Sequence, residues 1–398
     1  MLIQFSARNY KSFKDTLTLD LFTKKQEAVS AIYTEADSNI YSSAVFYGAN
    51  GSGKSNILKA FAMMRRLVLN EDKIIQSTDV LPINQFRLSS ESEDDTTSFD
   101  ICFVHNGKKY KYGFEYDSTC VYSEYLYIYE SVRRTIVFEY DVDENNGKIK
   151  APQYKDLQNL KHLKNSLFLV EADRNDNSEA KNVLQWFNSC RFIEYSSRMP
   201  LNPAYWNNLS KPGIKELFQT FITSADFGIK DIFQEVKSGN DNIEEVTVKT
   251  LHPKYDENNN PVSDVPFNLF DDESLGTQKY FHVIGPVIDA LQRGSALFLD
   301  ELDASLHPIL TRKIVELFNN KDANKKGAQL IFTSQDTNLL DQSLFDKEQI
   351  WFVEKDKYGC SHLTGLAEYK DVRKEHKIER NYIMGKYGAI PYLGDFNF

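Results

Sequence analysis

Residues 48–55 read Gly-Ala-Asn-Gly-Ser-Gly-Lys-Ser, which fits the pattern G-x-x-x-x-G-K-S. In this pattern the glycines let backbone N–H groups converge on phosphate oxygens, Lys54 reaches the terminal phosphates, and the Ser55 hydroxyl ligates Mg²⁺. An apolar run ends at residue 47 and a helical pattern begins at residue 56, so a strand, the loop and a helix N-terminus are expected in that order. The residues predicted to bind nucleotide here are Gly48, Asn50, Gly51, Ser52, Gly53, Lys54, Ser55 and Asn56.

Composition sets the broad class of the chain. Its 398 residues are 41% apolar, enough for one large domain or two lobes. No apolar run approaches 18 residues, and the N-terminus alternates like a strand, so the cytoplasm is the expected compartment and no membrane is predicted. The formal charge of −10 means that any nucleic-acid contact would need a local basic patch. Four cysteines, at 102, 120, 190 and 360, lack metal-type spacing and are predicted to be packed thiols.

The pattern of apolar residues changes along the chain. Residues 1–22 predict two strands around the turn 9–15, and residues 98–150 predict an antiparallel sheet with a hairpin at Asn106-Gly107. Lysines alternate with tyrosines there, which indicates half-buried strands or, less simply, a surface that stacks on nucleic acid. Residues 155–235 favour helices without a heptad repeat. We therefore expect an N-terminal lobe over 1–150, a helical insertion over 151–240 and a C-terminal lobe over 241–398.

A second motif follows in the C-terminal half. Residues 296–301 read Ala-Leu-Phe-Leu-Asp-Glu, an apolar strand that ends in two carboxylates. Beside a phosphate-binding loop, Asp300 would hold Mg²⁺ and Glu301 would polarise the attacking water as general base. A buried strand that meets a solvated turn is the plain structural alternative. Together with the first motif, the pair predicts a nucleoside triphosphate hydrolase that uses Mg²⁺, in which Lys54 also has a catalytic role.

The spacing of further residues resembles that of ABC-type ATPases. Residues 273–278 read Glu-Ser-Leu-Gly-Thr-Gln, and Ser274 and Gly276 resemble the S-x-G signature of that class, which binds the γ-phosphate held by another subunit. The resemblance implies a homodimer with composite ATP sites. It also assigns Asp303 to the loop that senses the other subunit. Gln335 stands where this class usually has a histidine, so its catalytic role can involve a hydrogen bond but no charge. Gln85 is a candidate for the glutamine that links Mg²⁺ to the lobe interface.

The whole chain resembles the RloA/AbiL-type group of bacterial ABC-class ATPases, relatives of RecF, SMC and OLD proteins. The matching stretches are residues 9–13, 48–55, 225–229, 273–278, 300–308 and 380–395. The resemblance implies an α/β fold with an ABC-type ATPase head: a mixed sheet around the phosphate-loop helix, an antiparallel β lobe, a helical insertion and no long coiled coil. It also implies an antiphage abortive-infection system with a separate effector, an RloB-like or other toxin or nuclease.

Three functions follow from these features. The first is an ATP-driven dimerising switch, alone or within a higher assembly, that controls a partner effector. The second is a RecF-like DNA-repair ATPase, which predicts salt-sensitive DNA binding. The third is a nucleotide-bound scaffold with low turnover that cages its partner, an alternative that Gln335 keeps open.

Overall fold

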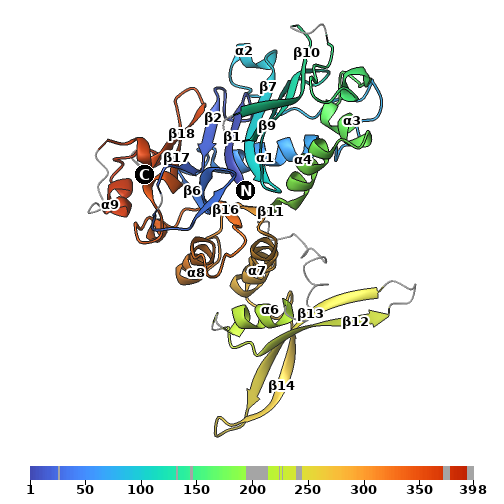
Figure 1. Cartoon of the computed structure of the whole chain (residues 1–398). Coiled ribbons are helices and arrows are strands. Elements are labelled where there is room, and N and C mark those ends of the chain that lie inside the picture. Colours follow the sequence, from blue (N-terminus) through green and yellow to red (C-terminus); the bar gives the residue numbers. More distant parts are fainter. Residues whose placement is uncertain are drawn as a thin grey trace.

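A six-stranded, mostly parallel sheet forms the centre of the chain (Figure 1). The computed structural model describes residues 1–25, 27–130, 133–143, 147–193, 214–223, 225, 227–238, 244–370 and 377–391. The central strands, in spatial order, are β11 (Arg191–Ile193), β15 (Ala296–Leu299), β16 (Gln329–Thr333), β6 (Ser43–Tyr47), β17 (Ile350–Lys355) and β18 (Ser361–Gly365). All neighbouring pairs are parallel except β17 and β18.

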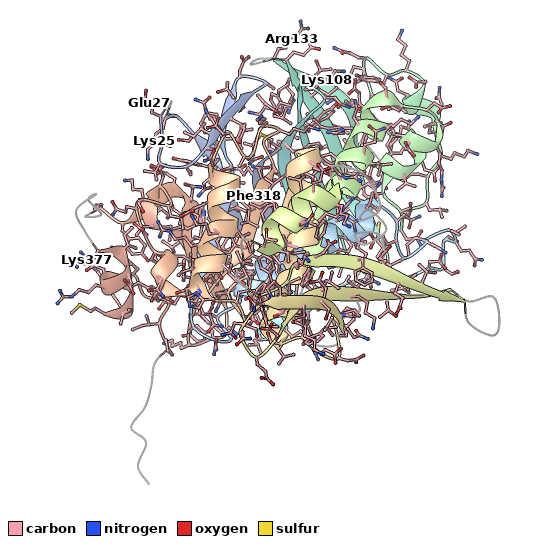
Figure 2. The ribbon with its side chains drawn as sticks, turned by 90° about the horizontal axis from the view of Figure 1, so that it is seen from below. Lys25, Glu27, Lys108, Arg133, Phe318 and Lys377 are labelled. Atoms are coloured by element: carbon pink, nitrogen blue, oxygen red, sulfur yellow. The ribbon has the colours of Figure 1, made fainter. Side chains whose placement is uncertain are left out.

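Both faces of this sheet are covered, which explains why the inner strands β15, β16 and β6 are buried at every position and mostly apolar. In β6, Ala44 and Phe46 belong to one core, which also holds helix α1 (Lys54–Val68). Val45 and Tyr47 belong to a second core, with α7 (Leu275–Arg293) and α8 (Pro308–Asn319) on the other face. Figure 2 labels Phe318 of α8, whose side chain is fully buried in this second core.

An antiparallel sheet packs over α1 and confirms the predicted strands. Its order is β10 (Arg133–Asp141), β9 (Val121–Glu130), β8 (Lys108–Tyr116), β7 (Thr97–His105), β1 (Leu2–Arg8) and β2 (Leu17–Asp20). Asn106 and Gly107 have φ values of 50° and 73°, as the predicted hairpin turn requires. Tyr110 and Tyr112 are fully buried, so these two rings stabilise the core and are not available to stack on nucleic acid.

The predicted helical insertion is only partly helical. It contains the 3₁₀ turn η1 (Leu157–Asn159) and the helices α3 (Phe168–Arg174), α4 (Ser178–Ser189) and α6 (Ile214–Thr223). However, β11 lies between α4 and α6, and β12 (Asp231–Ser238) follows α6. α4 packs on the N-terminal lobe, where Trp186 stacks on Phe103 with ring centroids 4.2 Å apart. Our helical prediction was therefore wrong for both strands, which are set by their pairing partners.

A three-stranded sheet projects from the rest of the molecule at the bottom of Figure 1. β12 pairs with β13 (Glu244–Tyr255), which pairs with β14 (Pro261–Asn268), all antiparallel. At its base, Ile232 and Val248 are buried in the core shared with α7. Farther along, β14 is exposed over most of its length. The expected boundary at residue 240 falls between β12 and β13, so this sheet spans it.

The remaining described elements are a small sheet and several short helices. A small sheet contains β3 (Phe22–Thr23), β5 (Ser38–Tyr41) and β4 (Ile32–Glu35), and the short helices are α2 (Ser90–Glu93), η3 (Thr337–Leu339), η4 (Lys347–Gln349), η5 (Leu366–Glu368) and α9 (Ile378–Ile383). Tyr387 is buried and stacks on Phe352 of β17 with ring centroids 5.3 Å apart, so this part of the matching stretch 380–395 packs on the central sheet. Residues 392–395 of that stretch lie outside the described part. α7, with 19 residues, is the longest described helix, so the described residues form no long coiled coil. None of the helices described here is long and apolar enough to cross a membrane.

Candidate nucleotide-binding site

The predicted phosphate-binding loop connects β6 to α1 at the carboxyl edge of the parallel strands. Gly53 is the N-cap of α1 with a φ of 110°, and as a glycine it offers no side chain to the first N–H groups of the helix. A Cβ on Gly48 would lie 2.4 Å from the carbonyl oxygen of Val353. The loop is therefore a backbone cradle at a helix N-terminus, which suits an anion.

Lys54 points back into this cradle. Its Nζ donates to the carbonyl oxygens of Gly48 at 2.6 Å and Ala49 at 3.1 Å. Burial lowers the pKa of Lys54, while the carboxylates of Glu301 and Asp300 act in the opposite direction. The lysine is thus held close to the position where the terminal phosphates would lie.

The two sequence motifs meet at Asp300. The Ser55 hydroxyl donates to Asp300 Oδ1 at 3.0 Å, although the two residues lie in opposite halves of the chain. The Thr333 hydroxyl, at the end of β16, donates to the same oxygen at 2.6 Å and accepts a bond from the Glu301 N–H at 2.7 Å. A hydroxyl and a carboxylate are hard oxygen donors of the kind that Mg²⁺ prefers, so Ser55 and Asp300 fit this ion.

Glu301 is fixed by a residue that the sequence did not indicate. Its φ is 50°, a conformation that non-glycine residues rarely adopt. The fully buried Lys279 donates from Nζ to the Glu301 carbonyl oxygen at 3.1 Å. Burial lowers the pKa of Lys279 to about 8, against the opposing effect of Glu301, Asp303 and Asp300. Thr333 and Lys279 are therefore site residues that sequence reasoning missed.

The predicted signature residues begin α7, as expected. Ser274 is the N-cap and accepts from the Thr277 N–H at 3.1 Å. A Cβ on Gly276 would lie 3.1 Å from the Ser305 carbonyl oxygen, so a small residue is needed there. Ser274 is exposed, and the described hydrogen bonds do not connect it to the phosphate-binding loop of the same chain.

The residue before the signature connects α7 to the projecting sheet. The buried Glu273 carboxylate accepts from the Thr250 hydroxyl at 2.5 Å and lies 2.7 Å from His252 Nε2, both on β13. The His252 ring also packs on Phe267 of β14, with ring centroids 4.6 Å apart. All three strands of the projecting sheet are thus joined, directly or through β13, to the first turn of α7.

Asp303 and Gln335 lie side by side at the edge of the site. The Gln335 N–H donates to Asp303 Oδ2 at 3.0 Å, and the side chain of Gln335 is exposed. The other oxygen, Asp303 Oδ1, is buried without a hydrogen-bond partner in the described part of the chain. His307 caps α8 by accepting from the Ile309 N–H at 3.3 Å, which is a structural role.

Gln85 has a different environment. Its amide donates to the Asp95 carbonyl oxygen, and it lines a cavity of about 580 Å³ beside Lys11, Ser12 and Asn56. Among the described residues, none of its hydrogen bonds reaches Ser55 or Asp300. Its predicted role as a magnesium ligand therefore stays a prediction.

The fold and the site define a P-loop nucleotide-binding domain: a glycine loop between a strand and a helix, and a carboxylate at the end of a nearby parallel strand. Residues 43–341 match the family described as "AAA domain, putative AbiEii toxin, Type IV TA system", and the chain belongs to that family. The match contains the phosphate-binding loop, the signature, Asp300 and Gln335. A search of curated proteins gave no significant match. An AAA-type P-loop family of this kind binds ATP with Mg²⁺, in agreement with the donor set at Ser55 and Asp300.

Proposed function

We propose that this protein is an ABC-type ATPase of the RloA/AbiL type, a Mg-ATP-dependent switch that controls a partner effector in bacterial antiphage defence. The observation that carries the proposal is the 3.0 Å hydrogen bond from Ser55 to Asp300, because it brings the two nucleotide motifs into one site. The family's toxin–antitoxin context supports a defence setting with a second protein.

The residues of the site have separate roles in ATP hydrolysis. Lys54 and the N-terminus of α1 bind phosphate oxygens, and Ser55 and Asp300 hold Mg²⁺. When bound, Mg²⁺ neutralises charge on the phosphate oxygens. Glu301 takes a proton from the attacking water as general base, in a position fixed by Thr333 and Lys279 through its backbone.

A second copy of the chain completes the site in this proposal. Ser274 is exposed at the N-terminus of α7, where it can bind a phosphate group of the nucleotide held by another chain. The adjacent Leu275 is 63% exposed, so an apolar side chain beside Ser274 is available for contact with the second copy. Closure of the dimer is then driven by the difference in ATP affinity between the closed and open states.

The experiment uses Glu301→Gln, which retains ATP because the general base is lost. With ATP and Mg²⁺ on a sizing column, this variant should elute as a dimer, and without ATP as a monomer. Adding Ser274→Arg should return it to the monomer while ATP binding is kept. A Glu301→Gln protein that binds ATP but stays monomeric would rule out the composite site.

A scaffold with low turnover is the second candidate, favoured by the exposed Gln335 side chain, which cannot carry charge at the switch position. Phosphate release by the wild type, with Lys54→Ala as the background control, separates the two functions. Turnover clearly above the control supports the ATPase. Turnover equal to the control, with ATP binding retained by the wild type only, supports the scaffold.

A further inference from the structure

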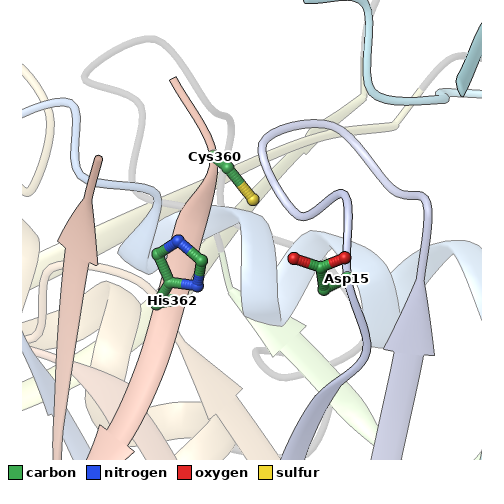
Figure 3. A group of neighbouring side chains, drawn as sticks. All are labelled: Asp15, Cys360 and His362. Carbon is green, nitrogen blue, oxygen red and sulfur yellow. The ribbon is translucent and has the colours of Figure 1, made fainter. Parts of the chain in front are cut away.

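Three side chains that bind transition metals gather behind the phosphate-binding loop. Asp15 lies in the turn before β2, Cys360 directly precedes β18, and His362 is the second residue of β18. One ligand atom from each residue lies within 4.8 Å of the other two. Figure 3 shows the Cys360 sulfur and the His362 ring on the same side of β18, both directed at the Asp15 carboxylate. Only Ser361 separates the two residues, and side chains two apart along an extended backbone point to the same face.

A fourth residue orients two of these groups. Asp356 Oδ2 lies 3.3 Å from His362 Nε2, which leaves Nδ1 of the ring for a metal ion. Asp356 Oδ1 accepts from the Cys360 N–H at 2.9 Å and thereby fixes the backbone that carries the thiol. In protein metal sites, the ring nitrogen of a histidine ligand that does not bind the metal commonly donates a hydrogen bond to a carboxylate.

We propose that Asp15, Cys360 and His362 form a binding site for a borderline-soft divalent cation, with Zn²⁺ as the best fit. A thiolate, an imidazole and a carboxylate together favour Zn²⁺ over Mg²⁺ or Ca²⁺, which prefer oxygen ligands. Ligand atoms in a tetrahedral zinc site lie roughly 3.3–3.8 Å apart, so the cluster needs to contract by about 1 Å. Asp15 and His362 are exposed and Cys360 is buried, so this movement falls to the Asp15 and His362 side chains. Water would take the fourth position.

The location connects this site to the phosphate-binding loop. Ser361, between the two β18 ligands, donates its hydroxyl to the Ser52 carbonyl oxygen at 2.6 Å and its N–H to the Ser12 carbonyl oxygen at 2.7 Å. The Ser12 hydroxyl in turn accepts from the Asn56 side chain at 2.7 Å. The ion would therefore tie together the two segments, 9–16 and 356–362, that support the loop from behind.

The experiment titrates metal-free protein with Co²⁺, whose absorption reports a bound thiolate, and then displaces it with Zn²⁺. We expect one Co²⁺ per chain with a thiolate charge-transfer band, lost on addition of Zn²⁺. Cys360→Ser should abolish the band, and Asp356→Asn should weaken Zn²⁺ binding 10–100-fold. Cys120→Ser, a partly exposed cysteine elsewhere, is the matched control and should leave the band unchanged. Lys54→Ala should also leave it unchanged, so that failure of the nucleotide site and failure of this site are distinguishable.

Two outcomes would overturn the proposal: no thiolate band in the wild type, or a band that persists in Cys360→Ser. Thermal unfolding of each metal-free variant shows whether it is folded. If Cys360→Ser does not fold, His362→Gln, which changes an exposed side chain, takes its place: a wild-type affinity in that variant contradicts the site, and a weakened one supports it.

Discussion

Thr333 donates its hydroxyl hydrogen to Asp300 Oδ1 at 2.6 Å, and the same oxygen accepts from Ser55 at 3.0 Å. Since Thr333 also accepts from the Glu301 N–H, one hydroxyl group orients both residues of the carboxylate pair. The neighbouring strand β16 therefore determines how β15 presents its two acidic side chains.

Thr333→Val should lower Mg-dependent ATP turnover about 10–100-fold, the usual cost of removing a partner of a metal ligand. It should also raise the Mg²⁺ concentration needed for half-maximal rate, which a magnesium titration of phosphate release measures. Thr311→Val is the matched control, because Thr311 is buried and its hydroxyl has no partner among the described residues. If both variants show the same magnesium dependence as the wild type, Thr333 does not position Asp300.

Lys279→Met should lower the catalytic rate while nucleotide affinity stays near that of the wild type. The substitution removes the bond to the Glu301 carbonyl oxygen and the positive charge that faces Glu301, Asp303 and Asp300, while methionine fills similar space. Removal of one member of a buried charge cluster destabilises the fold, so urea unfolding is measured first and rates are compared where the variant is folded. Rates and ATP affinity measured separately would show this split. Lys313→Met, on the exposed surface of α8, is the control. An equal loss of affinity and rate would instead indicate direct contact of Lys279 with the nucleotide.

Gly48→Ala should damage the loop more than Gly51→Ala, although both change one glycine of the same motif. A Cβ on Gly48 would lie 2.4 Å from the Val353 backbone, which cannot move without distorting the sheet, whereas a Cβ on Gly51 meets open space. Gly51 has a φ of 75°, so its substitution costs only about 1–2 kcal/mol of backbone strain. Urea unfolding of the two variants gives the comparison, and the opposite order would contradict the packing of Gly48 on β17.

Ionisation of the buried Glu124 carboxyl group should lower the free energy of unfolding as the pH rises. Burial raises the pKa of Glu124 to about 7, although its carboxylate accepts from the Leu169 and Phe168 N–H groups at the start of α3 and from the Tyr112 hydroxyl. Because the folded-state value lies above the ordinary value of 4.5, this contribution to stability is complete below pH 4.5 and is lost as the pH passes through about 7.

The free energy of unfolding of the wild type should therefore fall by up to roughly 3 kcal/mol between these limits from this group alone. Glu124→Gln, which resembles the protonated acid, should remove that part of the fall. The exposed Glu257→Gln serves as control. Urea unfolding at pH 5 and pH 8 gives the free energy of unfolding at each pH. If this free energy falls by the same amount in the wild type and in Glu124→Gln, the pH dependence does not come from Glu124.

Local patterns were sufficient to predict much of this fold. The strand before residue 48, the helix after it and the hairpin at Asn106 all depend on residues close together in sequence, and each is present. β11 and β12 were missed because a three-residue strand has no periodicity and because β12 follows a helical stretch. In such cases the pairing partner, and not the local sequence, decides the structure.

The residues of the site likewise include some that local sequence predicts and some that it does not. Ser55 and Asp300 belong to recognisable motifs, and the fold brings them into contact. Thr333 and Lys279 belong to an apolar strand and an apolar helix, and only the packing of β16 and α7 shows what they contact. Cys360 is buried, in agreement with the packed thiol that the sequence predicts, whereas its proximity to Asp15 could not be predicted because Asp15 comes from the opposite end of the chain.

The contacts of Glu273 with Thr250 and His252 connect the projecting sheet to the start of α7. The outer part of β13 projects away from the rest of the molecule (Figure 1), and Thr250 and His252 of the same strand contact Glu273, the residue just before Ser274. A partner bound at the outer end of the sheet would therefore be connected to the start of α7 through β13, without any contact with the phosphate-binding loop.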